Sequence, residues 1–481
     1  MKKNISISLV LTLLICLTGC KKLVDVGAPV TSINSANVYS SDATAIAAVT
    51  GIYAVIGNTP FQGGSLSAMS LLPGLSADEL GLFPGSGNAY QAMAPYYTNN
   101  LSSITTGSAD FWTVIYPLVY NANAAIAGLS NNSLLTPAVD QQLLGEAEFV
   151  RALCYFYLVN LYGDVPLVIS TDYKVNADAS RTSRQLVWQQ ITSDLTSAQN
   201  LLSPNYLDGT LLTSSSQRIR PTSWAATALL ARTYLYRQIW DSAESEATLM
   251  INNTALFGLT GLDTTFLAIS SEAIWQLQPT TSGQNTPDAQ TFIIPSTGPG
   301  SNWPVYLSSQ FMNSFEPGDQ RRVDWTDSVI AGGITWYYPF KYKVNTLDAP
   351  VTEYEMVLRL GEQFLIRAEA RAQQGKTTGA AGALQDLNTI RERAGLPDYS
   401  GGTDAPSILS AILHERQVEL FTEWGHRWLD LKRTNSVDSV MGSPGGACAA
   451  KGGAWNSYQQ WYPITLTELE RDPNLVQNSG Y

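Results

Sequence analysis

The residues of this chain with the clearest chemical potential are the charged groups between positions 414 and 433. His414-Glu415 matches the start of the H-E-x-x-H motif, in which two histidines one helical turn apart bind zinc. Position 418 is Val, so the second metal ligand is absent and no zinc site is predicted. The charged residues can instead pair along a helix and across to its neighbours, which predicts a structural ion-pair network. These residues are Glu415, Arg416, Glu419, Glu423, Arg427, Asp430, Lys432 and Arg433.

Asp78-Glu79 is the one pair of carboxylates that suggests hydrolytic chemistry. A glycoside hydrolase needs two carboxylates in one cleft, whereas adjacent residues of an extended chain point to opposite sides. A hydrolase is therefore kept only as an alternative function. Asp319, Asp324 and Asp327 lack the spacing of a calcium loop. No nucleophile motif, phosphate-binding loop or metal cluster occurs elsewhere, so the sequence predicts no catalytic or metal-binding residues and no cofactor.

Composition and charge restrict the partners of the protein. The 481 residues include 28 Lys and Arg against 40 Asp and Glu, a formal charge of −12. This balance argues against nucleic acid, which requires a basic surface, and equally against a polyanionic ligand. A neutral or weakly charged partner fits best. With 44% hydrophobic residues, a chain of this length can bury a large core.

Residues 1–19 have the pattern of a lipoprotein signal peptide. Two lysines precede a short apolar run, 5–17, and the segment ends in Leu-Thr-Gly-Cys. In such a sequence the signal peptidase cleaves before the cysteine, here Cys20, whose thiol is then acylated. Because two or three acyl chains bind a membrane stably, we expect a lipid-anchored protein in which 20–40 forms an extended tether.

Helical periodicity predicts the elements that position these residues. Apolar residues recur at intervals of three and four over long segments that end at Gly, Pro or polar turn residues. The Ala231–Ala243 spacing of a tetratricopeptide-like hairpin recurs as Ala368–Ala380. Four degenerate helix pairs are therefore predicted, two of them with long insertions; a generic helix bundle is the alternative. The predicted helices cover 43–56, 110–129, 141–162, 185–202, 224–237, 242–251, 360–374, 378–394 and a last run from 405 that Gly425 breaks before 427–433.

Three segments rich in Gly, Pro, Ser and Asn interrupt the helical pattern. They are about 57–107, 254–358 and 436–465. Loops of this length without structure of their own are usually functional. Within the second segment, 272–278 and 335–343 are strand-like. We therefore predict a mainly α fold in a single domain, 41–481, whose tetratricopeptide-like helix pairs form a scaffold and whose irregular loops and few short strands build one binding face.

Several blocks of the sequence resemble, in order, the SusD/RagB-like family of surface glycan-binding lipoproteins. The terminal block is His414-Glu415-Arg416…Glu419-Leu420…Gly425-His426-Arg427-Trp428…Asp430-Leu431-Lys432-Arg433; the family usually has Glu-Gly where this chain has Glu423-Trp424-Gly425. The other blocks are Glu146…Pro166-Leu167, Arg220-Pro221-Thr222…Tyr236, Phe364…Ala370, Leu387…Leu396, Tyr462-Pro463-Ile464 and Pro473…Tyr481. Together, behind a lipoprotein signal, they are highly specific and cover nearly all of the mature chain.

The resemblance implies a non-catalytic lipoprotein on the outer face of the outer membrane. Proteins of this family cap a SusC-like TonB-dependent transporter, capture oligosaccharide or polysaccharide and help to pass it inward. Their tetratricopeptide-like helices serve partly as the scaffold that faces the transporter, and the glycan binds at the opposite, loop-built face. A tetratricopeptide-type scaffold that binds a peptide or protein is a further alternative.

Aromatic and amide side chains in two loops are the candidate glycan-binding residues. Sugars present flat C–H faces and a rim of hydroxyls, so a binder needs aromatic platforms flanked by hydrogen-bonding groups. Two or three platforms give only weak binding after association costs, which suits release to a transporter. Trp303 is the leading platform. The full candidate set is Trp303, Tyr306, Asn302, Tyr90, Tyr96, Asn88 and Asn99.

Overall fold

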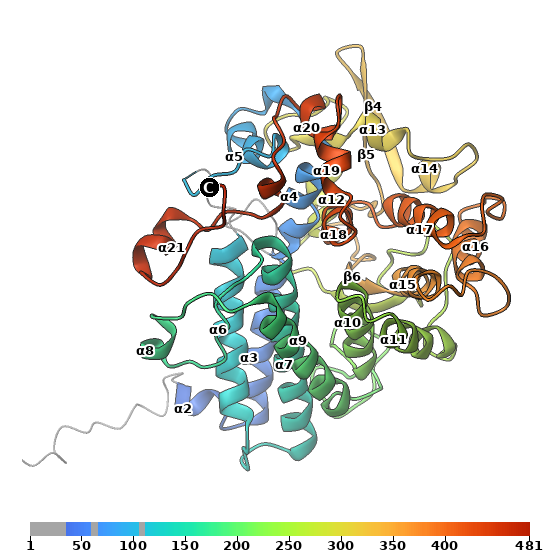
Figure 1. Cartoon of the computed structure of the whole chain (residues 1–481). Coiled ribbons are helices and arrows are strands. Elements are labelled where there is room, and N and C mark those ends of the chain that lie inside the picture. The colour runs from blue at the N-terminus through green and yellow to red at the C-terminus, as the bar shows by residue number, and fades with distance from the viewer. Residues whose placement is uncertain (1–34, 59–65, 105–110) are drawn as a thin grey trace, which may run out of the picture.

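The computed structural model describes residues 35–58, 66–104 and 111–481, and helices dominate it (Figure 1). The long helices follow the lower and right-hand edges of the molecule in that view, each packed against the next in chain order, and most of the shorter elements gather at the top. The predicted mainly α fold with a few short strands is confirmed. The long helices are α3 (Asp42–Ile56), α6 (Phe111–Leu129), α7 (Pro137–Tyr162), α9 (Arg184–Leu201), α10 (Ser223–Tyr236), α11 (Trp240–Asn252), α15 (Leu360–Gln373), α16 (Ala383–Arg393) and α17 (Ala405–Glu419).

Shorter helices and strands complete the described part of the chain. The short helices are α2 (Ser35–Val38), α4 (Leu72–Ser76), α5 (Asn88–Tyr97), α8 (Tyr173–Asn176), α12 (Pro287–Phe292), α13 (Ser309–Met312), α14 (Arg321–Asp324), α18 (His426–Arg433), α19 (Val437–Gly442), α20 (Ala447–Ala450) and α21 (Leu466–Arg471), with 3₁₀ turns η2 (Leu66–Met69), η3 (Pro84–Ser86) and η5 (Ser457–Gln460). The strands are β1 (Leu80–Leu82), β2 (Ala273–Leu277), β3 (Val305–Leu307), β4 (Thr326–Ala331), β5 (Ile334–Pro339) and β6 (Glu355–Arg359).

Local sequence explains most of the helix ends. Ser41 caps α3 and Asp404 caps α17, each side chain accepting a hydrogen bond from a backbone N–H of the first turn. Helix α7 begins at Pro137, four residues before the predicted start, because proline needs no N–H partner in a first turn. It ends as predicted before Gly163, whose φ of 79° lies in the left-handed region that favours glycine.

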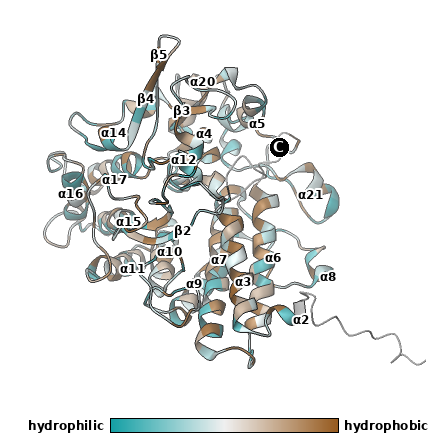
Figure 2. Ribbon diagram, turned by 180° about the vertical axis from the view of Figure 1, so that it is seen from behind, coloured by the Kyte–Doolittle hydropathy of each residue, from teal (hydrophilic) through white to brown (hydrophobic). Residues whose placement is uncertain are grey.

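Helix α7 is the centre of the helical layer. It packs against α3, α6 and α9, and Figure 2 shows its residues as predominantly hydrophobic. Most of its side chains are buried, among them the free thiol of Cys154, which packs as a small apolar group. Although α7 has 26 residues, none of the helices in the described ranges is long and apolar enough to cross a membrane.

Small residues at the helix contacts confirm one of the two predicted alanine spacings. Ala231 and Ala243 share a buried cluster, so α10 and α11 approach closely, as in a tetratricopeptide hairpin. The second spacing, Ala368–Ala380, is wrong because Ala380 is exposed in the turn that precedes α16. Ala383, the first residue of α16, takes the predicted place beside Ala368.

The segment 66–82 is not the structureless loop that its composition predicts. It folds into η2, α4 and β1, and its side chains are buried almost without exception. A short element that is enclosed on all sides has no polar face, so its sequence carries no helical or strand periodicity. The first predicted loop region is therefore part of the core over this stretch.

The strands of the described ranges form three two-stranded antiparallel sheets, two of which join parts of the chain that are far apart in sequence. β1 pairs with β3, with Gly81 opposite Tyr306, and β2 pairs with β6. β4 and β5 form a hairpin closed by Gly332 and Gly333, both with positive φ. The β1–β3 pairing brings the first two predicted loop regions into contact and places them at one end of the molecule.

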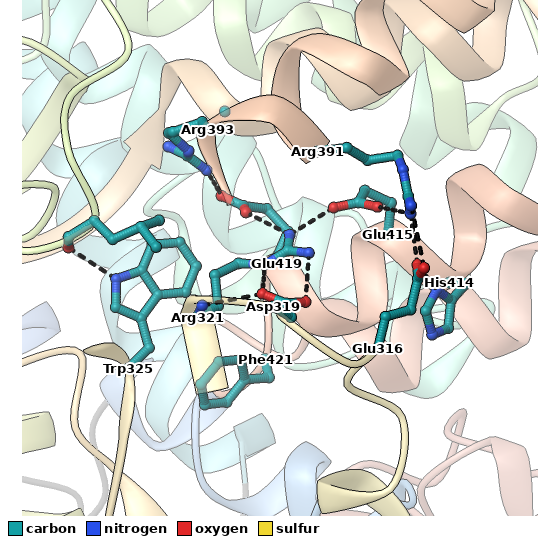
Figure 3. A network of polar contacts seen from close by, with 12 residues as sticks. Glu316, Asp319, Arg321, Trp325, Arg391, Arg393, His414, Glu415, Glu419 and Phe421 are labelled. Carbon is teal, nitrogen blue, oxygen red and sulfur yellow. Dashed lines mark hydrogen bonds and ion pairs between the residues drawn. The ribbon is translucent and has the colours of Figure 1, made fainter. Parts of the chain in front are cut away.

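The predicted ion-pair network is present and largely buried (Figure 3). Arg321 is fully enclosed and contacts Asp319 at 2.8 Å, Glu415 at 2.6 Å and Glu419 at 3.0 Å. Arg359 contacts Glu419 as well, at 2.6 Å. Burial raises the pKa of a carboxyl group, but the surrounding arginines outweigh it and hold the pKa of Glu419 well below its usual range. These charges fix how α17 docks against α14, β6 and α16.

Candidate functional site

A cavity of about 680 Å³ lies between the β1–β3 pair, the β4–β5 hairpin and the segment around α20. Four aromatic side chains line it, together with the amides of Gln310 and Asn313. Rings beside amides are the groups that a sugar-binding surface requires. The aromatic residues are Tyr97, Tyr306, Trp336 and Tyr337.

Strand pairing and the hairpin position the rings of this cavity. Tyr306 lies on β3, and its ring meets that of Trp336 on β5 edge to face, with centroids 4.8 Å apart. Phe83 packs on Trp336 in the same manner at 5.6 Å. Edge-to-face pairs of this kind are favourable, so Trp336 is held between two rings while remaining partly accessible.

Tyr97 enters the cavity from helix α5. Burial, followed by the nearby Tyr306 and Tyr90, raises the pKa of the Tyr97 phenol to about 12. The hydroxyl is therefore neutral at physiological pH and able to donate a hydrogen bond. The ammonium of Lys451 lies 5.5 Å from the centre of the Tyr97 ring.

The charged residues of the cavity floor are held by other groups of the protein. Both oxygens of Asp78 accept hydrogen bonds from Arg427, at 2.8 and 2.7 Å. Lys451 donates to the carbonyl oxygens of Leu75, Ser76 and Ala77 at the C-terminal end of α4, where a cation is favoured. Burial lowers the pKa of Lys451 to about 7.

Glu79 does not join Asp78 in the cavity. It is buried in the core, and burial, followed by the charge of Asp78, raises its pKa to about 8. Asp78 is the one carboxylate that lines this cavity in the described part of the chain, and Arg427 occupies it. The arrangement therefore does not offer a bound sugar the two carboxylates that the hydrolase alternative needs.

The structure disperses the candidate residues predicted from sequence. Tyr306 lines the cavity, and Tyr90 is half-buried near Tyr97. Trp303 is half-buried and Asn302 exposed in a turn before β3 closed by backbone hydrogen bonds between Gly300 and Trp303; neither of the two lines the cavity. Asn88 is exposed at the start of α5.

Tyr96 and Asn99 are buried, so the prediction that they serve as a surface platform and a hydrogen-bonding partner for a glycan is wrong. Tyr96 is only 1% exposed and packs edge to face on Tyr462, with ring centroids 5.3 Å apart. Asn99 is buried and donates to the carbonyl oxygen of Ser76 at 3.0 Å. Helix α5 turns the neighbouring residue, Tyr97, toward the cavity.

Trp336, Tyr337 and Tyr97 are the cavity residues that sequence reasoning missed. Trp336 and Tyr337 fall in the predicted strand 335–343, where aromatic residues are typical of packing. The signal that distinguishes them is Gly332-Gly333, which marks a tight hairpin whose strands leave the body of the protein. Side chains near such a tip can face a cavity.

A second cavity of about 470 Å³ lies between α3, the loop before α10 and the end of β2. Its aromatic residue, Tyr53, is buried and donates a hydrogen bond to Glu146 at 2.7 Å. Arg220 at the same place pairs with Glu146 at 2.8 Å. Because these groups are already satisfied, the first cavity is the stronger candidate site.

Comparison with known proteins identifies the family. The model of the SusD family matches residues 324–481, and the model described as "starch-binding associating with outer membrane" matches residues 82–235. The chain belongs to the SusD/RagB-like family. Its members include SusD-like protein P2 of Formosa agariphila, which is 26% identical and aligns over 98% of this chain and 98% of its own length.

Solved structures show the same fold for this SusD/RagB-like protein. A SusD superfamily protein from Bacteroides vulgatus superposes with a TM-score of 0.77 at 20% identity, covering 92% of this chain and 100% of the other. Surface glycan-binding protein A from Bacteroides fluxus superposes with a TM-score of 0.72 at 20% identity, covering 91% and 99%.

The terminal signature of this SusD/RagB-like protein is structural. Arg416 pairs with Asp430 at 2.7 Å, and Arg433 bridges Asp430 and Glu369. His414, the residue that opened the zinc hypothesis, contacts the carbonyl oxygen of Ser314 at 2.8 Å. No group of three or more potential metal ligands occurs within 35–58, 66–104 and 111–481. The prediction of an ion-pair network is confirmed.

Proposed function

We propose that this protein binds oligosaccharide or polysaccharide in the cavity lined by Tyr97, Tyr306, Trp336 and Tyr337 and delivers it to a TonB-dependent outer-membrane transporter. The observation that carries the proposal is the partly accessible ring of Trp336 beside the amides of Gln310 and Asn313 in one cavity of about 680 Å³. Family membership and the glycan-binding relative from Bacteroides fluxus support the same function.

The energetics of such a site suit capture followed by release. Each ring that stacks on a sugar contributes about 1–2 kcal/mol by analogy with other stacking contacts. After the cost of association, two or three rings give binding of roughly millimolar to micromolar strength. A binder of this strength holds a glycan near the cell surface and still gives it up to a transporter.

The proposal places the protein on the outer face of the outer membrane through the lipidated Cys20. The description of one family model, which names association with the outer membrane, supports this location. Cys20, the signal peptide 1–19 and most of the tether lie outside the described residues. The lipid anchor and the SusC-like partner therefore rest on the lipoprotein signal and on the family.

Affinity gel electrophoresis of a soluble form that starts after Cys20 tests the proposed function. Retardation by a polysaccharide, with affinity reduced about tenfold or more by Trp336→Ala, supports the proposed site. Trp303→Ala is the matched control, because Trp303 does not line the cavity. Loss of binding in Trp303→Ala alone moves the site to the turn before β3. No retardation by any polysaccharide overturns the function and favours the peptide-binding alternative.

A hydrolysis assay separates binding from catalysis. Any glycan that retards the protein is incubated with it, and the reducing ends released are measured. We expect no increase over a sample without protein, because Asp78 is occupied by Arg427 and Glu79 lies in the core. A steady release of reducing ends, lost in Asp78→Asn, would favour the glycoside hydrolase.

A further inference from the structure

Arg322 has no firm partner, unlike nearly every other arginine in the described ranges. One of its terminal nitrogens, Nη1, lies 3.5 Å from the carbonyl oxygen of Met312, at the limit of a hydrogen bond, and it forms no ion pair with a described residue. Each of the others except Arg184 forms an ion pair or a hydrogen bond of 3.1 Å or less. Arg184 forms an exposed ion pair with Asp164 at 3.9 Å and does not line the cavity. Its neighbour Arg321 is fully buried with three carboxylates, whereas Arg322 is exposed.

This available guanidinium lines the proposed glycan cavity. Arg322 stands on α14, and its contact with Met312 places it beside α13, which contributes Gln310 to the same wall. The two other charged residues of the lining are engaged, since Asp78 is held by Arg427 and Lys451 by backbone carbonyls. The charge that the cavity can offer to a ligand is therefore positive, in a protein whose net charge is −12.

We propose that the saccharide bound in this cavity carries an anionic group, a carboxylate or a sulfate, and that Arg322 binds it beside the aromatic rings. The inference rests on the proposed function and names the substrate class of the same site. A guanidinium presents several N–H donors in a planar fork that matches a pair of anionic oxygens. The amides of Gln310 and Asn313 are left to bind hydroxyl groups of the same saccharide.

Local charge and net charge act over different distances at this site. Salt screens exposed charges beyond about 8 Å at physiological ionic strength, so the acidic surface as a whole has little effect on one group bound at Arg322. The proposal departs from the expectation from composition, which argues against a polyanionic ligand and favours a neutral or weakly charged partner. The proposed ligand is a saccharide with an acidic group at the subsite beside Arg322.

Matched pairs of polysaccharides test the proposal by affinity gel electrophoresis. Polygalacturonate and alginate are compared with their carboxyl-reduced forms, and κ-carrageenan with its desulfated form, which separates uronate from sulfate recognition. We expect retardation by at least one acidic member and weaker retardation by its neutral partner. Arg322→Gln should lower the affinity for the acidic member about tenfold and leave the neutral partner unaffected.

Two further variants control for charge and geometry. Arg322→Lys keeps the charge but loses the fork and should give an intermediate affinity. Arg471→Gln removes one exposed positive charge on α21, far from α14 in Figure 1, and should bind as the unmodified protein does. Raising the salt concentration should weaken binding of the acidic member in the unmodified protein more than in Arg322→Gln.

The outcomes distinguish the inference from the function on which it rests. Equal retardation by both members of every pair, or by neutral glycans alone, overturns the anionic ligand and leaves glycan binding in place. Unchanged affinity of Arg322→Gln for an acidic glycan also overturns the role of Arg322. If no polysaccharide of either kind retards the protein, the proposed function fails, and the inference fails with it.

Discussion

The ring of Tyr306 lies across the backbone of Gly81 on the neighbouring strand. The two residues are directly opposite in the β1–β3 pair, and a β-carbon added to Gly81 would lie 2.4 Å from Cε2 of Tyr306. The missing side chain at position 81 thus leaves room for the ring that packs on Trp336. One glycine in β1 determines where an aromatic residue of β3 stands in the cavity.

Gly81→Ala is expected to weaken glycan binding without unfolding the protein. The added methyl group displaces the Tyr306 ring, which is the free end of a side chain and can rotate away at moderate cost. Affinity electrophoresis should show a severalfold loss, while the midpoint of thermal unfolding changes little. Gly209→Ala is the control, since its β-carbon meets nothing within 4 Å. Unchanged binding by Gly81→Ala would mean that the position of Tyr306 is unimportant.

Arg321→Met is expected to destabilise the fold severely. The substitution leaves the carboxylates of Asp319, Glu415 and Glu419 buried with one fewer cation, and breaking a buried pair costs about 3–5 kcal/mol. Urea unfolding followed by tryptophan fluorescence measures the loss. Arg471→Met breaks an exposed pair and should change stability by less than about 1 kcal/mol. Equal stability of the two variants would show that the network does not hold α14 to α17.

Glu79→Gln is expected to stabilise the protein at alkaline pH. The pKa of Glu79 is raised to about 8 by burial and then by Asp78, so between its unfolded pKa, about 4.3, and 8 the folded state binds more protons than the unfolded state. Stability contributed by this group is present at low pH and is lost as the pH rises through that window. Glutamine mimics the protonated acid and removes the pH dependence of stability that the titration of Glu79 causes.

The measurement is the difference in unfolding free energy between Glu79→Gln and the unmodified protein at several pH values. The difference should be small near pH 5 and grow to roughly 5 kcal/mol at most near pH 8. Taking a difference cancels the titration of other buried groups such as Asp288, whose pKa is also raised by burial, to about 7. A difference that does not change with pH would contradict the raised pKa of Glu79.

Cys20→Ser is expected to abolish lipid attachment. The full chain, produced in a bacterium with the lipoprotein pathway and fed radiolabelled palmitate, should carry label only when Cys20 is present. Protease added to intact cells should then degrade the anchored protein if it is exposed at the surface. Cys448→Ser is a control of the same chemistry, because Cys448 is buried in the folded chain. Labelling of the Cys20→Ser variant would show that the lipid is attached to another residue and would contradict the prediction that Cys20 is the acylated residue.

The long helices could be predicted to within a few residues because the information for them is local. Caps such as Asp404, the stop at Gly163 and the apolar spacing of each helix all lie within the segment that they define. The prediction failed where an element has no polar face, as in 66–82. It also failed where a turn displaced the expected alanine contact from Ala380 to Ala383.

The sequence by itself determined the family, the helical scaffold and the charged signature that becomes the ion-pair network. Only the tertiary structure decided the candidate site, because its walls come from α5, β3, the β4–β5 hairpin and the segment around α20, which are remote in the chain. Whether Tyr96 or Tyr97 faces the cavity depends on how α5 packs against Tyr462. The same aromatic side chains occur in the core and in the candidate site. Packing against residues that are distant in the chain determines which ring is buried in the core and which is available to a ligand.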